Sequence, residues 1–127
     1  MTKSELIPWL VTTGRALLGV LFVAGGMRHV RLFSAIAADM KQMGLPFPRF
    51  MLAAGTTFQI TAGTLLILGL FVFPAALGLI AFTIVASVMM LPFWSMQGGA
   101  RTTAYLNWLS NVGIVGGLLL AAAQDLY

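Results

Sequence analysis

The amino-acid sequence predicts an all-α integral membrane protein, a four-helix bundle with a short interfacial helix in its first loop. The first observation is composition: 60% of the 127 residues are hydrophobic and only 8% are charged, with a mean hydropathy of +0.99. Soluble domains are about one-quarter charged, so these few charges cannot cover a water-exposed surface. The second observation is that four long apolar stretches make up most of the chain.

Each apolar stretch is long enough to cross a bilayer as a helix. A helix needs roughly 20 residues to span a hydrocarbon core of about 30 Å. We expect spans at approximately 7–27, 50–72, 74–93 and 105–123, with Pro74 at the start of the third. The stretches do not alternate in polarity as barrel strands do, which favours helices. The length predicts a single transmembrane domain over residues 1–127.

The one long connection contains an amphipathic segment at residues 30–43. Its apolar residues recur every three or four positions and therefore share one helical face; they are Val30, Phe33, Ile36, Met40 and Met43. This pattern is typical of a short helix in the membrane interface. A lid packed on the bundle would produce the same pattern. Gly44 and Pro46 end the segment.

The charges of the chain predict its orientation and exclude one class of partner. Most basic residues lie in the first and third connections, namely Arg28, Arg31, Lys41, Arg49 and Arg101. The positive-inside rule then places loops 28–49 and 94–104 in the cytoplasm and both termini outside. The net charge of +4 therefore reflects membrane topology, so the expected partner is the lipid bilayer and not nucleic acid.

Arg15 is the most informative single position, because it lies inside the first apolar stretch. An arginine within a span costs a few kcal/mol or more and normally faces the bundle interior, where it has a partner. It could instead extend along the helix to the headgroups on the terminal side. No carboxylate lies inside any predicted span. An inward Arg15 would therefore hold an amide, a carbonyl, water, lipid phosphate or a ligand.

Other polar side chains could extend this site along the bundle. Gln59, near mid-bilayer, is the expected partner of Arg15, although bonding between helices would also explain it. The candidate ligand-binding residues are Arg15, Gln59, Asn111, His29, Asn107 and Trp94. His29 could also be a solvated rim residue, and Trp94 could belong to the interfacial aromatic belt. No catalytic residue can be identified.

Glycines at four-residue spacing predict close contacts between helices. Gly55 and Gly63 flank Gln59 on the second span, and Gly113 and Gly117 lie on the fourth. Such stripes would also allow a homo-oligomer.

The sequence has no haem, flavin or metal motif. Cysteine is absent and there is one histidine, so the chain alone cannot supply thiolate ligands or the paired axial histidines of a haem. Nor is there a nucleophile–base pair or a glycine-rich phosphate loop.

Several segments in order resemble DoxX-family membrane proteins. They are residues 14–22, Gly25, Gly26 and His29, then 44–46, 59–70, 76–78 and 111–120. The resemblance covers nearly the whole chain. It implies a four-helix protein of the DoxX/DoxD type in the cytoplasmic (inner) membrane of a bacterium.

The resemblance also implies a function. Members are described as oxidoreductases or as membrane subunits of redox assemblies, linked to thiosulfate:quinone oxidoreduction, to quinone and catechol detoxification and to oxidative stress. The resemblance further implies Glu in many relatives at the position where this chain has Gln59. If that carboxylate pairs with the arginine or handles protons in the relatives, its absence here argues against proton transfer at this position.

Three functional hypotheses follow. The favoured one is a redox subunit without its own redox centre, which binds a quinone near Arg15 and Gln59 and receives electrons from a partner protein or a soluble donor. The second is a non-catalytic anchor or scaffold for a redox partner, docked through loop 28–49. The third is a small-molecule or lipid-binding membrane protein in which Arg15 meets an anionic headgroup.

Overall fold

The computed structural model describes residues 1–126 and confirms the all-α membrane fold. Its helices are α1 (Lys3–Arg31), α2 (Phe33–Gln42), α3 (Pro48–Leu68), α4 (Val72–Met90) and α5 (Gly98–Gln124), with a 3-10 turn, η1 (Phe93–Ser95), before α5. Four of these helices, all except α2, are long and apolar enough to cross a membrane.

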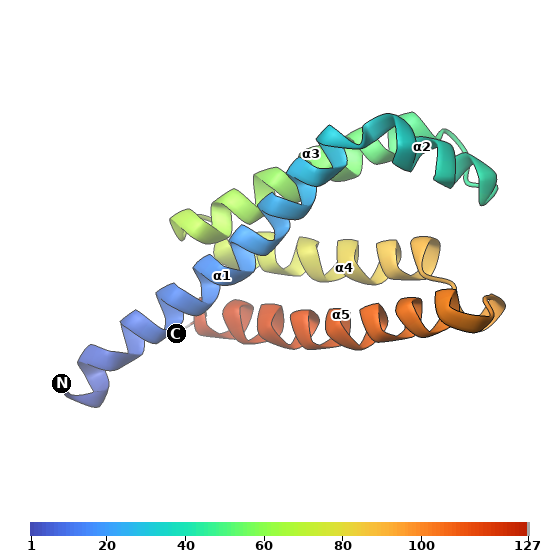
Figure 1. Ribbon diagram of the computed structural model, residues 1–127. Helices are drawn as coiled ribbons and strands as arrows, with labels where there is room; N and C mark the ends of the chain where they lie inside the picture. Colours follow the sequence, from blue (N-terminus) through green and yellow to red (C-terminus); the bar gives the residue numbers. More distant parts are fainter. Residues whose placement is uncertain (127) are drawn as a thin grey trace.

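Helix α1 is longer than the predicted first span. Thr2 and Glu5 form a capping box that starts the helix ahead of the apolar run. Its 29 residues give a length of about 43 Å, more than a hydrocarbon core requires. The N-terminal half of α1 consequently extends beyond the other helices (Figure 1).

The turn between α3 and α4 falls earlier than predicted. Helix α3 ends at Leu68 because Gly69 adopts a left-handed conformation with φ of 74°, which ends a helix readily. Phe71, also left-handed, precedes the first residue of α4, Val72. Pro74 therefore lies within the first turn of α4 and does not begin it. Helix α5 likewise starts at Gly98, well before the predicted span.

The helices associate as two pairs, α1 with α3 and α4 with α5 (Figure 1). Helix α1 crosses α3 where Gly19 faces Gly63. A Cβ atom on Gly19 would lie 2.5 Å from the Gly63 carbonyl oxygen, so only glycine permits this approach. The predicted contact of Gly113 is absent within the described chain: a Cβ atom added to Gly117 would meet Leu18, whereas one added to Gly113 would meet nothing within 4 Å.

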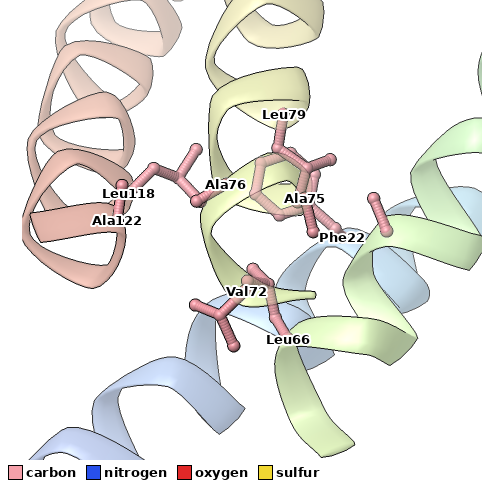
Figure 2. Close-up of a cluster of buried hydrophobic side chains, with 9 residues drawn as sticks. Phe22, Leu66, Val72, Ala75, Ala76, Leu79, Leu118 and Ala122 are labelled. Carbon is pink, nitrogen blue, oxygen red and sulfur yellow. The ribbon is translucent and has the colours of Figure 1, made fainter. Parts of the chain in front are cut away.

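An apolar core joins the two pairs. Phe22, Leu66, Leu79 and Leu118 come from all four long helices and gather around the start of α4 (Figure 2). A second, smaller cluster packs α2 on α3 through Ala37, Met40 and Leu52. This packing matches the lid interpretation of the amphipathic segment, except that Val30 belongs to α1 and is exposed.

Candidate functional site

Three side-chain hydrogen bonds connect α1 to α3 along their length. Arg15 Nε donates to the Leu66 carbonyl oxygen at 2.8 Å. Gln59 Nε2 donates to the Phe22 carbonyl oxygen at 3.0 Å. His29 Nδ1 and Thr56 Oγ1 share a bond of 3.3 Å. The polar residues predicted on these two helices are therefore used separately, at three different levels.

Arg15 turns inward, toward the last turn of α3. The carbonyl groups there carry the negative end of the helix dipole, which favours a cation. The guanidinium lies over Gly69, where a Cβ atom would come within 2.7 Å of Nη2. Because α1 begins early and extends past the bundle, Arg15 is level with the α3–α4 turn. It is thus nearer the end of the bundle than the sequence suggested.

A cavity of about 570 Å³ opens beside Arg15, between α1 and α5. Asp125 also lines it, and its Oδ2 accepts a hydrogen bond of 3.0 Å from the backbone N–H of Phe73 in the first turn of α4. The remaining lining residues are Leu10, Val11, Gly14, Leu18, Val72, Gly117, Leu120, Ala121 and Gln124. We call this space the terminal cavity.

Gln59 does not pair with Arg15, so that prediction was wrong. The amide of Gln59 packs against Gly25 of α1, and Leu66, the partner of Arg15, lies two helical turns farther along α3, about 10 Å. The side chain of Gln59 is 6% exposed. Its Oε1 has no hydrogen-bond partner among residues 1–126.

A second cavity, of about 420 Å³, lies between α3 and α4 near the loops. His29 and Thr56 line it, so their hydrogen bond provides its polar group. Its walls are otherwise apolar: Ile36, Met40, Met51, Leu52, Gly55, Gly78, Ala81, Phe82, Val85, Ala86, Met89 and Met90. We call this space the loop cavity. Drug-sized ligands typically occupy cavities of about 300–1,000 Å³ with few polar groups.

Helix α2 closes one side of the loop cavity, because Ile36 and Met40 line it. Met40 is buried against Leu52 of α3, and Met90 of α4 packs on the same cluster. Val85, also a lining residue, is 55% exposed. The loop cavity is therefore covered by α2 and open between α3 and α4, where a membrane protein meets lipid.

The predicted residues of α5 do not reach the loop cavity. Asn111 Nδ2 donates to Ser87 Oγ of α4 at 2.8 Å, and Ser87 Oγ donates to the Thr83 carbonyl oxygen at 2.7 Å. Asn107 is exposed on the outer face of α5. These contacts join α5 to α4 and leave α1 and α3 untouched.

Trp94 belongs to an aromatic cluster at the end of α4. It makes edge-to-face contacts with Phe93 and Trp108, and Tyr105 packs on Phe93. Trp108 Nε1 also donates to the Leu91 carbonyl oxygen at 2.8 Å. This cluster fastens η1 and α5 to α4.

Three residues of these contacts were missed in the sequence. Thr56 lies one helical turn before Gln59 on the same face of α3, a spacing that could have revealed it. Asp125 follows the last apolar stretch, where a single acidic side chain gives no signal of its role. Ser87 lies in an apolar run and has no motif. In residues 1–126, no three His, Asp or Glu side chains gather as a metal site would require.

Two comparisons with known proteins give matches. The model of the DoxX family matches residues 10–92. Inner membrane protein YphA of Escherichia coli (strain K12) is 28% identical over 115 residues, which cover 91% of this chain and 82% of the relative. No solved structure matches the chain.

Proposed function

The chain belongs to the DoxX family of membrane proteins, and from this premise we propose that it is a quinone-linked redox subunit whose loop cavity binds the quinone ring. The family membership and the four apolar helices make it an integral inner membrane protein. The quinone is the ligand class that the family resemblance implies. The observation that carries the proposal is the apolar loop cavity with its one polar group, the His29–Thr56 pair.

The loop cavity fits a quinone in size and in lining. A quinone ring is flat and apolar, with carbonyl oxygens that accept hydrogen bonds, and its isoprenoid tail requires lipid. Phe82 and the methionines supply adaptable apolar walls. The opening beside the exposed Val85 gives the tail a path to the bilayer. A quinone would supply two-electron chemistry, with electrons delivered by a partner protein.

His29 is the group that would hold the carbonyl oxygen. When the Thr56 hydroxyl donates to Nδ1 of His29, the imidazole carries its proton on Nε2 and offers an N–H donor. A donor fixed in an apolar site stabilises negative charge that develops on an oxygen during reduction. Thr56 would act through His29 and is therefore a positioning residue.

The loop cavity is not the Arg15–Gln59 site that the sequence predicted. Arg15 lines the terminal cavity and Gln59 lines neither cavity. One quinone ring therefore cannot meet both side chains in this arrangement. Gln59 instead connects α1 to α3 between the cavities.

Calorimetric titration of the purified protein with a short-chain ubiquinone analogue tests the proposal. We expect His29→Leu to raise Kd about tenfold, since a lost hydrogen bond of this kind costs about 1.4 kcal/mol. Thr56→Val keeps the shape of the side chain and should raise Kd about threefold, because the imidazole loses its orientation. Arg101 is exposed at the start of α5, and Arg101→Gln is the control.

The result can contradict either the site or the function. If Arg15→Gln weakens binding while His29→Leu does not, the ring occupies the terminal cavity and the proposed site is wrong. If the wild-type protein binds no quinone analogue, the redox proposal itself is wrong. A scaffold role would then account better for the bundle.

A further inference from the structure

The terminal cavity contains two opposite charges that the protein does not pair with each other. Arg15 Nε is bound to the Leu66 carbonyl oxygen, and Asp125 Oδ2 is bound to the backbone N–H of Phe73. Both side chains nevertheless line the same space of about 570 Å³. Each charge thus stabilises one end of a helix while it faces a common cavity.

Both side chains keep unused hydrogen-bonding atoms. A guanidinium has five N–H donors in a planar fork, and only the Nε donor of Arg15 is engaged within the described chain. Asp125 likewise keeps Oδ1 without a hydrogen bond to residues 1–126. A ligand in the terminal cavity would meet a strong donor group on α1 and a strong acceptor directly after α5.

The walls of the terminal cavity are apolar and reach the lipid-facing surface. Leu10 and Leu120 line it and are 62% and 74% exposed. The cavity also lies beside the α3–α4 turn, where the bundle ends on the terminal side (Figure 1). At this level a membrane protein meets phospholipid headgroups, while the lining leucines nearer the bundle centre, Leu18 and Leu120, meet acyl chains.

We propose that the terminal cavity binds a zwitterionic phospholipid whose headgroup carries a primary ammonium, as phosphatidylethanolamine does. The Nη groups of Arg15 bind the phosphate, whose geometry matches the guanidinium fork. Asp125 Oδ1 accepts a hydrogen bond from the ammonium. An acyl chain then lies along Leu18 and Leu120, toward the centre of the bundle.

The two opposite charges, on Arg15 and Asp125, favour a zwitterionic lipid over other lipids. A purely anionic headgroup would satisfy Arg15 but would bring its negative charge beside Asp125. A quaternary ammonium, as in phosphatidylcholine, has no N–H to donate to the carboxylate. Only a headgroup with both a phosphate and an N–H cation satisfies both residues. This site is separate from the quinone proposal and does not depend on it.

Native mass spectrometry of the protein in mild detergent measures this preference. Phosphatidylethanolamine, phosphatidylcholine and phosphatidylglycerol with identical acyl chains would be titrated in turn. For the wild type we expect phosphatidylethanolamine to bind about tenfold more tightly than phosphatidylcholine, the value of one charged hydrogen bond. Arg15→Gln should weaken all three lipids, and Arg101→Gln should change none.

Asp125→Asn is the decisive variant. The asparagine retains an amide oxygen that can accept from Phe73 N, so the start of α4 stays capped. It loses the negative charge, and phosphatidylethanolamine should then bind no better than phosphatidylcholine. If Arg15→Gln fails to fold, this variant still decides the question.

Three results would overturn the proposal. The wild type could bind phosphatidylethanolamine and phosphatidylcholine equally, Asp125→Asn could keep the full preference, or phosphatidylglycerol could bind most tightly. The last result would make the terminal cavity a simple anion site.

Discussion

The two ends of the bundle accommodate polar groups in different ways. At the loop end, a neutral pair, His29 and Thr56, bonds within an apolar cavity. At the terminal end, Arg15 and Asp125 carry charges, and each stabilises a helix terminus. A charge is costly among apolar walls, whereas the end of a helix dipole partly offsets that cost.

The difference indicates that the two cavities suit different ligands. The loop cavity offers one neutral polar pair, His29 and Thr56, and lateral access, which suits a weakly polar, lipid-soluble ring. The terminal cavity offers two charges beside the turn, which suits a headgroup. A four-helix chain of this size can therefore hold two unrelated sites, because α1 contacts α3 at both ends and has few contacts with α5.

The crossing of α1 and α3 lies between the cavities, and disturbing it should affect both. Gly19→Ala would place Cβ 2.5 Å from a backbone oxygen, which neither helix can avoid by a side-chain movement. We expect a loss of about 2 kcal/mol in the free energy of unfolding, as for other overpacked sites. Weaker binding of both ligand classes should accompany it. Thermal unfolding in detergent measures the loss.

Gly116→Ala is the matched control for this substitution. Gly116 also lies within a helix, but an added Cβ would have no neighbour within 4 Å. Its unfolding temperature should stay the same or rise slightly, since alanine favours helix. Equal losses in the two variants would mean that the close crossing is not what holds the pair together.

Filling only the loop cavity should weaken quinone binding and leave lipid binding unchanged. Ala86 lines that cavity, and Ala86→Phe would occupy the space proposed for the ring. We expect Kd for the quinone analogue to rise at least about tenfold, because the phenylalanine ring takes the space of the quinone ring. Lipid binding at the terminal cavity should not change.

Val88→Phe controls for the added aromatic ring. Val88 lies on the same helix, is 47% exposed and does not line the loop cavity. Unchanged quinone binding is expected. If both phenylalanines weaken quinone binding alike, the ring does not bind at the loop cavity.

The fold could be predicted because lipid imposes simple requirements on a chain. Length and apolarity alone identify the four spans. Boundaries were less accurate, because they depend on caps that hydropathy does not record. The Thr2–Glu5 capping box lengthens α1, and Gly69 ends α3 before the apolar run stops.

The candidate sites could be predicted only in part, because the level of a residue on a tilted helix depends on its neighbours. Arg15 and His29 were found as unusual residues for an apolar chain, and both line cavities. The partners of Arg15, Gln59 and His29 were not found. Leu66 and Phe22 contribute backbone carbonyl oxygens, which no side-chain pattern reveals, and Asp125 acts from the end of the chain.

Gln59 lies between the cavities, and its substitution should have an effect of intermediate size on stability. Gln59→Leu removes the donor to the Phe22 carbonyl oxygen and leaves that oxygen buried. We expect a loss of about 1 kcal/mol in unfolding free energy, the usual net value of one hydrogen bond. The ligand preference of each cavity should not change. A more stable variant would mean that the unpartnered Oε1 costs more than the bond contributes.

The smallest effect is expected at Thr83, on the other helix pair. Its side chain is 6% exposed, and its hydroxyl meets no partner in the part of the chain that the structure describes. Thr83→Val has nearly the same shape and removes a buried polar atom that contributes no bond. The unfolding free energy should therefore stay within about 0.5 kcal/mol of the wild type or rise, because burying an unpaired hydroxyl is unfavourable. Ser87→Ala, one turn away, removes the acceptor of Asn111 and should cost about 1 kcal/mol or more. A Thr83→Val variant that loses as much as Ser87→Ala would show that the Thr83 hydroxyl holds a water or ligand inside the bundle.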